Sequence, residues 1–215
     1  MSNFPNREAT TDQAPAPAPT SPSAPSYPAE LECDVTTERG MTLRMRPIQS
    51  EDADRLVAFH HRLSSSSVYR RYFSVHPTLS SAEVEHLTNV DYVERMAFIV
   101  QDGDQLVGVG RYDRIPITTE AEVAFVVADE YQHQGIGLLL LDQLAAAAWK
   151  VGITDFVAET MVENRNMMNV FQDSGFPVTT TLEEEVLSVH FPIEPNEVYW
   201  AASAQRRARN PVRGG

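Results

Sequence analysis

The apolar positions of this chain first settle into a regular pattern near residue 42. Residues 42–48 alternate between apolar and polar side chains, which is the period of a half-buried strand. Apolar residues then recur at helical spacing over residues 50–63 and 65–75, and Ser80 with Glu83 has the spacing of a capping box at the start of a third helix. The first part of the domain is therefore predicted to be one strand followed by three helical segments.

The pattern changes to strands after residue 95. Residues 96–100 and 105–112 are predicted to be two strands joined by the turn Asp102-Gly103-Asp104, and residues 120–128 a third strand. Helices and strands then alternate, with a helix from Leu138, a strand over 153–160, a helix over 164–174 and a last strand over 185–191. This order of elements predicts a mixed α/β domain.

The two ends of the chain differ from the middle in composition. Seven of the fourteen prolines precede residue 29, and such a segment buries too little apolar area to offset the loss of chain entropy. We therefore expect residues 1–39 to be a disordered Pro/Ala-rich tail. Residues 40–195 form the expected domain, and residues 196–215 a C-terminal extension made basic by the arginines at 206, 207, 209 and 213.

Composition and charge remove several classes of function. The net charge of −13 argues against a nucleic-acid binder, because affinity for phosphate backbones needs clustered Lys and Arg. No apolar run approaches the roughly 20 residues of a membrane span, and no signal-peptide pattern is present at the N-terminus, so the cytoplasm is the expected location. The single cysteine, Cys33, excludes an internal disulfide, and the histidines show no ligand spacing, so no metal is expected.

A glycine-containing turn connects the strand over 120–128 to the long apolar helix. The turn reads Gln132-His133-Gln134-Gly135-Ile136-Gly137-Leu138. Backbone N–H groups at the start of a helix have no partner within it, and together with the helix dipole they favour a phosphate anion.

Three known phosphate loops can be compared with this turn. A dinucleotide fold needs a third glycine and a place near the first strand of the domain, and this turn has neither. A P-loop needs Lys and then Ser or Thr after its last glycine, whereas Leu138 follows Gly137 here. The acetyl-CoA pyrophosphate loop, Gln/Arg-x-x-Gly-x-Gly/Ala, fits at every defined position. A tight strand–helix junction without any ligand is the remaining alternative for these glycines.

A second segment, from Asn164 to the pair Gly175-Phe176, supports the third of these loops. With it the chain resembles the GCN5-related N-acetyltransferase (GNAT) superfamily over roughly residues 42–192, where an Asn opens the helix and a Gly-Phe pair ends it. Four further segments resemble the catalytic domain of bacterial protein lysine acetyltransferases of the Pat type, namely Met45-Arg46-Pro47-Ile48, Arg62-Leu63-Ser64, Tyr69-Arg70-Arg71-Tyr72-Phe73 and Leu87-Thr88-Asn89-Val90-Asp91-Tyr92.

The resemblance implies a fold and a cofactor site. The fold is α/β, with a mixed, mostly antiparallel central sheet flanked by helices, and the acyl donor is acetyl-CoA. Asn164 matches a side chain that contacts the pantetheine arm, although an Asn at this place also suits a plain helix cap. The other implied cofactor-binding positions are the strand residues Phe125, Val126 and Val127 and the loop residues Gln132, His133, Gln134, Gly135, Ile136, Gly137 and Leu138.

Transfer of an acetyl group to lysine requires a neutral amine. A free lysine has a pKa of about 10.4, so near pH 7.5 the neutral form costs roughly 4 kcal/mol, and a carboxylate that removes the proton relieves part of this cost. The resemblance makes Glu122 the general base; spacing alone would favour an outward-facing strand residue with a solvated side chain, and Glu120 is a nearby rival. Phe171 stands where many superfamily members have a Tyr that protonates the departing thiolate, so no general acid is assigned.

Taken together, the sequence predicts an acetyl-CoA-dependent N-acetyltransferase. The implied acceptor is an exposed lysine of a protein, with AMP-forming acyl-CoA synthetases such as acetyl-CoA synthetase as the substrates that Pat-type enzymes modify and regulate. The sequence leaves two other interpretations open. One is an acetyltransferase for a small-molecule amine, and the other is a non-catalytic acyl-CoA-binding module that regulates a partner.

Overall fold

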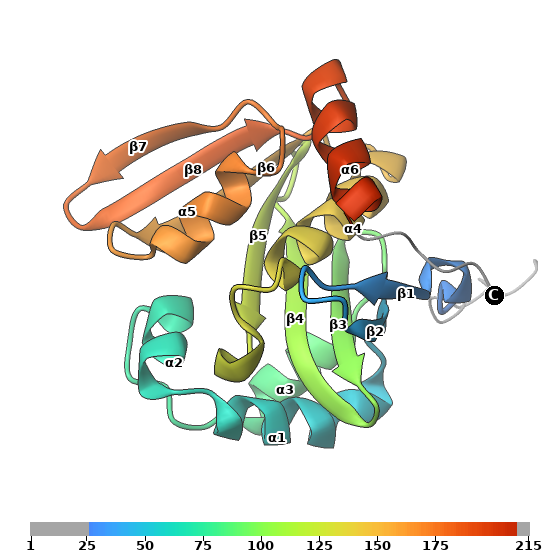
Figure 1. Cartoon of the computed structure of the whole chain (residues 1–215). Coiled ribbons are helices and arrows are strands. Elements are labelled where there is room, and N and C mark those ends of the chain that lie inside the picture. Colours follow the sequence, from blue (N-terminus) through green and yellow to red (C-terminus); the bar gives the residue numbers. More distant parts are fainter. Residues whose placement is uncertain (1–25, 210–215) are drawn as a thin grey trace, which may run out of the picture.

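The computed structural model describes residues 26–209, with side chains described as far as Ser203. Its centre is an eight-stranded sheet in the order β1-β2-β3-β4-β5-β6-β8-β7. Neighbouring strands run antiparallel, except β5 and β6, which are parallel. Figure 1 shows helices on both sides of this sheet. The expected α/β fold with a mixed, mostly antiparallel sheet is therefore confirmed.

The strands alternate with helices and short 3-10 turns along the chain. The strands are β1 (Cys33–Thr36), β2 (Thr42–Pro47), β3 (Arg95–Asp102), β4 (Gln105–Arg114), β5 (Glu120–Val127), β6 (Asp155–Met161), β7 (Thr179–Glu183) and β8 (Val186–Pro192). The helices are α1 (Ala53–Arg62), α2 (Ser65–Tyr72), α3 (Ser81–Thr88), α4 (Ile136–Lys150), α5 (Arg165–Gln172) and α6 (Glu197–Arg209). The 3-10 turns are η1 (Ala29–Leu31), η2 (Ser50–Asp52) and η3 (Asp129–Tyr131).

Two strands form where the sequence pattern indicates none. β1 pairs with β2 inside the segment expected to be a disordered tail, so the ordered domain starts before residue 40. β7 pairs with β8 at the far edge of the sheet, and all five of its residues are exposed. A four-residue strand and a fully exposed edge strand show no apolar alternation, which explains why both were missed. Residues 1–25 of the expected tail lie outside the described residues.

The C-terminal extension begins as a helix that packs against the domain. The ring of Tyr199 on α6 stacks on Phe176 with 4.7 Å between ring centroids, and Phe176 in turn stacks on Phe191. The backbone of Gly175 allows this contact, since a Cβ there would lie 2.9 Å from the Cα of Tyr199. Residues 210–215 of the expected basic extension lie outside the described residues, as do the side chains of its arginines.

The helices divide the core into two clusters, one on each face of the sheet. The larger cluster packs α4, α5 and α6 against one face through residues such as Leu140, Leu144 and Phe171. The smaller cluster packs α1, α2 and α3 against the other face through Leu56, Phe59 and Val68, among others. Within residues 26–209 no helix combines the length and the hydropathy needed to cross a membrane.

The parallel pair β5–β6 is the point where the sheet divides. Its paired register runs only from Glu120↔Asp155 to Glu122↔Val157, although both strands continue for several residues. In Figure 1, β6, β8 and β7 diverge from β3, β4 and β5 beyond this point. The backbone N–H of Ala128 donates to the Val107 carbonyl oxygen of β4. The backbone groups of consecutive residues in a strand point in opposite directions, so the N–H and C=O groups of Val127 and Phe125 point away from β4 and toward the opening.

Candidate active site

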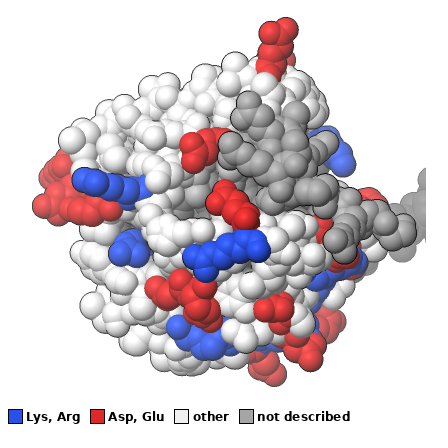
Figure 2. Space-filling view, viewed as in Figure 1, with Lys and Arg blue, Asp and Glu red and all other residues white. Residues whose placement is uncertain are grey.

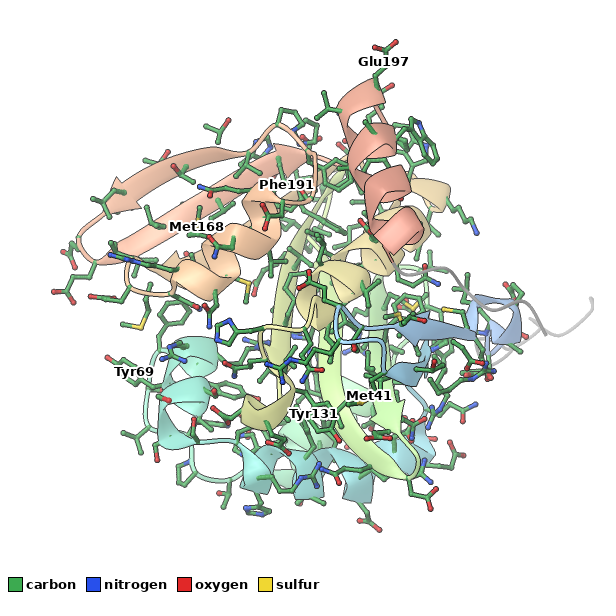
Figure 3. The ribbon with its side chains drawn as sticks, viewed as in Figure 1. Met41, Tyr69, Tyr131, Met168, Phe191 and Glu197 are labelled. Atoms are coloured by element: carbon green, nitrogen blue, oxygen red, sulfur yellow. The ribbon has the colours of Figure 1, made fainter. Side chains whose placement is uncertain are left out.

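The opening between β5 and β6 is part of a cavity of about 350 Å³. Its walls come from β5, η3, the loop before α4, the first turn of α4, and the helices α2 and α5. In Figure 3 the labelled Tyr131 belongs to η3 and the labelled Tyr69 to α2, two of the elements that border it. Residues far apart in sequence are therefore brought around one groove.

The glycine loop presents free backbone donors at one end of this cavity. Gly135 is the N-cap of α4 and has a φ of 80°, a left-handed conformation that favours glycine. Among the described residues, no backbone oxygen accepts from the N–H groups of Gly135, Ile136 or Gly137. At Gly137 a Cβ would lie 3.0 Å from Val170, so this glycine allows α4 and α5 to approach closely. These free N–H groups fit the phosphates of a CoA molecule.

Gln132 connects the loop to both β5 and α2. Its side-chain Nε2 donates to the Val127 carbonyl oxygen and to the Ser67 Oγ, both at 3.1 Å. Asp129 strengthens this connection by accepting from the backbone N–H of Ser64 and from the hydroxyls of Ser64 and Ser67, at 2.7–2.9 Å. Burial acts to raise the pKa of Asp129, but these hydrogen bonds outweigh it and hold the pKa below its usual range. The start of α2 is thereby fixed beside the loop.

The other predicted loop residues are divided between the cavity and the protein interior. His133 and Leu138 line the cavity, and the Nε2 of His133 lies 3.4 Å from the Nδ2 of Asn166 on α5. Gln134 does not line it. Its buried side chain donates through Nε2 to the Glu130 carbonyl oxygen, and the main-chain carbonyl oxygen of Gln134 accepts from the Glu38 N–H. The structure therefore does not bring Gln134 to the groove with its neighbours.

Asn164 serves as a helix cap and also reaches the cavity. Its Oδ1 accepts from the Met167 N–H at 3.3 Å, and it lines the cavity together with Phe125, Val126 and Val127. The capping bond uses the Oδ1 and leaves the Nδ2 group with no acceptor among the described residues. Both interpretations of this residue therefore fit the structure.

Glu122 lies outside the cavity, on the other face of the sheet. Its side chain is exposed, and Glu122 is the last β5 residue that pairs with β6. The rival Glu120 is 3.8 Å from His190, which is also 3.2 Å from Asp155. Glu122 instead interacts electrostatically with the guanidinium of Arg71. The exposed carboxylate thus sits where the sheet begins to divide, within electrostatic range of Arg71, which lines the cavity.

Several cavity residues were not singled out from the sequence as site residues. Arg70 and Arg71 occur in the segment that carries the family resemblance, but their helix spacing alone gave no sign that they face a groove. Glu38 comes from the β1–β2 turn, inside the expected tail, and its carboxylate would lie 3.2 Å from a Cβ at Gly135. The full set of such residues that line the cavity is Glu38, Ser67, Arg70, Arg71, Tyr131, Asn166, Met167, Asn169, Val170 and Asp173.

The chemistry of the groove matches an acyl-CoA in two respects. Free N–H groups at the start of α4 suit the phosphates. The edge of β5 beyond Glu122, with the N–H and C=O of Phe125 and the N–H of Val127, pairs with no other strand among the described residues and suits the amides of the pantetheine arm. Within the described part of the chain, no three His, Cys, Asp or Glu side chains gather in an arrangement that could hold a metal ion.

Comparisons with known proteins agree with this geometry. Residues 42–177 match the acetyltransferase (GNAT) domain family. The chain is 32% identical over 145 residues to Acetyltransferase Pat of Mycolicibacterium smegmatis, which covers 66% of this chain and 43% of that protein. It is 29% identical over 141 residues to an acetyltransferase of Pseudomonas aeruginosa, which covers 64% of this chain and 76% of that protein.

A solved structure gives the same answer. The crystal structure of the GNAT domain of S. lividans PAT superimposes with a TM-score of 0.74 at 38% sequence identity, covering 78% of this chain and 99% of that one. The chain belongs to the GNAT acetyltransferase family and is an acetyl-CoA-dependent N-acetyltransferase whose domain resembles those of bacterial Pat proteins. It spans less than half the length of the M. smegmatis protein.

Proposed function

We propose that this enzyme acetylates the side-chain amine of a lysine on a folded protein, and that its substrates are AMP-forming acyl-CoA synthetases, which the modification regulates. The resemblance to Pat-type domains supports this class of acceptor. The observation that carries the proposal is the position of Glu122, an exposed carboxylate at the point where β5 and β6 separate.

The surroundings of Glu122 favour a large, positively charged acceptor. Strand pairing places Glu120, Asp155 and Glu159 on the same face of the sheet as Glu122, and Glu159 is exposed. Figure 2 shows acidic side chains, with basic ones beside them, at the end of the β7–β8 hairpin, where Glu184 and Glu185 form the turn after Glu183, the last residue of β7. An exposed, acidic sheet face can meet a lysine-bearing protein surface, and opposite charges increase the rate of that encounter.

In the proposed reaction each part of the site has one task. When bound, acetyl-CoA supplies an activated acetyl group as a thioester. The N–H groups of Gly135, Ile136 and Gly137 hold its phosphates, and the backbone edge at Phe125 and Val127 orients its arm and carbonyl group. Glu122 accepts the proton of the acceptor ammonium, directly or through a water molecule, so that the neutral amine can attack.

The proposal is tested by incubating the protein with acetyl-CoA and candidate acyl-CoA synthetases and locating acetylated lysines by mass spectrometry. We expect Glu122→Gln to lower the acetylation rate by about 10²–10⁴-fold, the usual contribution of a general base, with little change in acetyl-CoA affinity. Glu120→Gln is the matched control, because it removes a neighbouring carboxylate from the same strand and face. It should stay within about threefold of the wild-type rate, well below the loss of a positioned base.

Three results would contradict the proposal in different ways. Full activity of Glu122→Gln between pH 7 and 9 would remove Glu122 as the base. Acetylation of polyamines or other small amines, with no modified lysine on any synthetase, would show that the acceptor is a small molecule. Tight binding of acetyl-CoA without transfer to either class would favour a binding module.

A further inference from the structure

The guanidinium of Arg71 occupies an unusual position between two cavities. Arg71 lines the large cavity and also a second one of about 30 Å³ on the α1–α3 face of the sheet. Its carbon Cζ lies 5.1 Å from the centre of the Tyr72 ring, a cation–π contact. Among the described residues, no hydrogen bond or ion pair to this guanidinium is formed.

The charges around Arg71 leave it without an adequate counter-ion. Burial is the largest influence and lowers the pKa of Arg71, and the neighbouring cation Arg111 lowers it further, whereas Glu122 and Asp113 act in the opposite direction at longer range. Asp113 is already bonded to Arg111. A partly buried cation with no hydrogen-bond or ion-pair partner among the described residues is costly, and the cost falls when a ligand brings an anion to it.

The direction of α2 shows which part of the ligand Arg71 meets. Ser67 lies beside Gln132 and Val127, at the phosphate end of the groove. Arg71 is one helical turn further on, and in the second cavity it lies among Arg111, Ala124 and Val126. Arg71 is therefore placed toward the level where β5 and β6 separate, away from the N–H groups at the start of α4. The negative charge that forms at that level is on the sulfur of the breaking thioester.

The position that could otherwise protonate this sulfur is apolar. Phe171 is 1% exposed, and its ring packs between those of Phe125 and Phe191, at centroid distances of 6.3 and 5.4 Å. Phe171 does not line the large cavity. A thiol with a pKa near 8.5 can leave as a thiolate without a proton donor if a cation stabilises it.

We propose that Arg71 is a catalytic residue that stabilises the CoA thiolate as it departs. The amine nitrogen forms a bond to the acetyl carbon, the carbon–sulfur bond breaks, and its electron pair stays on sulfur beside the Arg71 guanidinium. The ammonium proton that Glu122 accepted before the attack has passed to solvent, so Glu122 can also accept the proton that the amine nitrogen loses as the amide forms. The thiolate takes a proton from solvent after release. The proposal rests on acetyl-CoA as the donor and is independent of which amine accepts the acetyl group.

The test compares the affinities of CoA and of desulfo-CoA, which lacks the thiol, by titration calorimetry between pH 6 and 9. A nearby opposite charge lowers the pKa of an acid by about 1–3 units, so the thiol of bound CoA should titrate below the pKa that it has in free CoA. The wild-type enzyme should therefore bind CoA more tightly as the pH rises, by about tenfold or more relative to desulfo-CoA. The ratio of the affinities for CoA and desulfo-CoA removes the pH dependence of every contact that the two ligands share.

Substitutions at Arg71 assign the effect to this residue. Arg71→Gln should abolish the rise in relative affinity while still binding desulfo-CoA, and Arg71→Lys should keep part of it. Arg71→Met, which retains an apolar contact with Tyr72, is a second neutral variant if Arg71→Gln does not fold. Arg55→Gln is the control, because Arg55 is an arginine of α1 that lines neither cavity.

Two outcomes overturn the proposal. One is a relative affinity of the wild-type enzyme that does not change with pH, and the other is a rise that persists in the neutral variants. Neither outcome depends on finding an acceptor, so failure here is distinguishable from failure of the protein-acetylation proposal.

Discussion

The two ends of the groove are built from different parts of the chain. At the phosphate end, the donors are backbone N–H groups of three successive residues, Gly135 to Gly137, held by the start of α4. At the reacting end, side chains do the work, and Glu122 of β5 and Arg71 of α2 are separated by about fifty residues of sequence. The phosphate end therefore depends on local backbone geometry, whereas the reacting end depends on how α2 is held against the sheet.

The largest effect on acetyl-CoA binding should come from a side chain at the phosphate end. Gly135→Val places a β-branched residue at a φ of 80°, which costs about 1–2 kcal/mol, and its Cβ would meet the Glu38 side chain at 3.2 Å. Relaxing this strain turns the N–H groups away from the phosphates, so we expect acetyl-CoA to bind about a hundredfold more weakly in calorimetry.

Gly152→Val is the matched control for that variant. Gly152 has the same φ of 80° at the other end of α4, with nothing within 4 Å of its would-be Cβ. It should lose stability but keep its affinity for acetyl-CoA. Equal loss of affinity for acetyl-CoA in both variants would mean that the loss does not come from the N–H groups at the phosphate end.

A smaller effect is expected on adding a hydroxyl near the reacting end. Phe171→Tyr puts the group found in many relatives into a site packed by Phe125 and Phe191 rather than into the cavity. A buried hydroxyl without a partner should lower the free energy of unfolding by about 2 kcal/mol, measured by urea titration.

The rate of acetyl transfer in the same variant sharpens the comparison. We expect no increase in kcat for Phe171→Tyr, because its hydroxyl does not reach the groove. Phe73→Tyr, at an exposed position, should change neither stability nor rate. A faster Phe171→Tyr enzyme would show that a proton donor, rather than a cation, limits departure of the thiolate.

The smallest effect concerns the connection that holds α2 in place. Asp129→Asn weakens the bonds from Ser64 and Ser67, and because Asp129 is exposed we expect a loss of only about 1 kcal/mol at pH 7. The pKa of Asp129 is lowered in the folded state. Its contribution is therefore complete above the unfolded pKa of about 3.9 and is lost as the pH falls through the folded value.

Urea titrations at pH 7, 5 and 3 test this dependence. The difference in stability between the wild-type protein and Asp129→Asn should be constant from pH 7 to 5 and shrink by pH 3. A difference that stays the same at pH 3 would mean that the charge of Asp129 contributes nothing to holding α2.

Much of the fold followed from the apolar pattern. The buried strands β3 and β5 and the amphipathic helices α1 and α4 were predicted, because each buries a regular subset of its own residues. β1 and β7 were missed, because edge strands are stabilised mainly by backbone pairing with a neighbour, and this leaves no apolar period in the sequence. The expected boundary at residue 40 failed for the same reason.

The sequence by itself determined the glycine loop and the class of cofactor, since a strand, a left-handed glycine and a helix start occupy one short segment whose geometry is local. It also indicated Glu122, through the family resemblance. Only the tertiary structure decided that Gln134 turns inward, that Phe171 is sealed in the core, and that Arg71 lines the groove with no ion-pair partner among the described residues. Those features arise where α2, β5 and α5 meet, and contacts between distant segments are set by the packing of the whole domain rather than by local pattern.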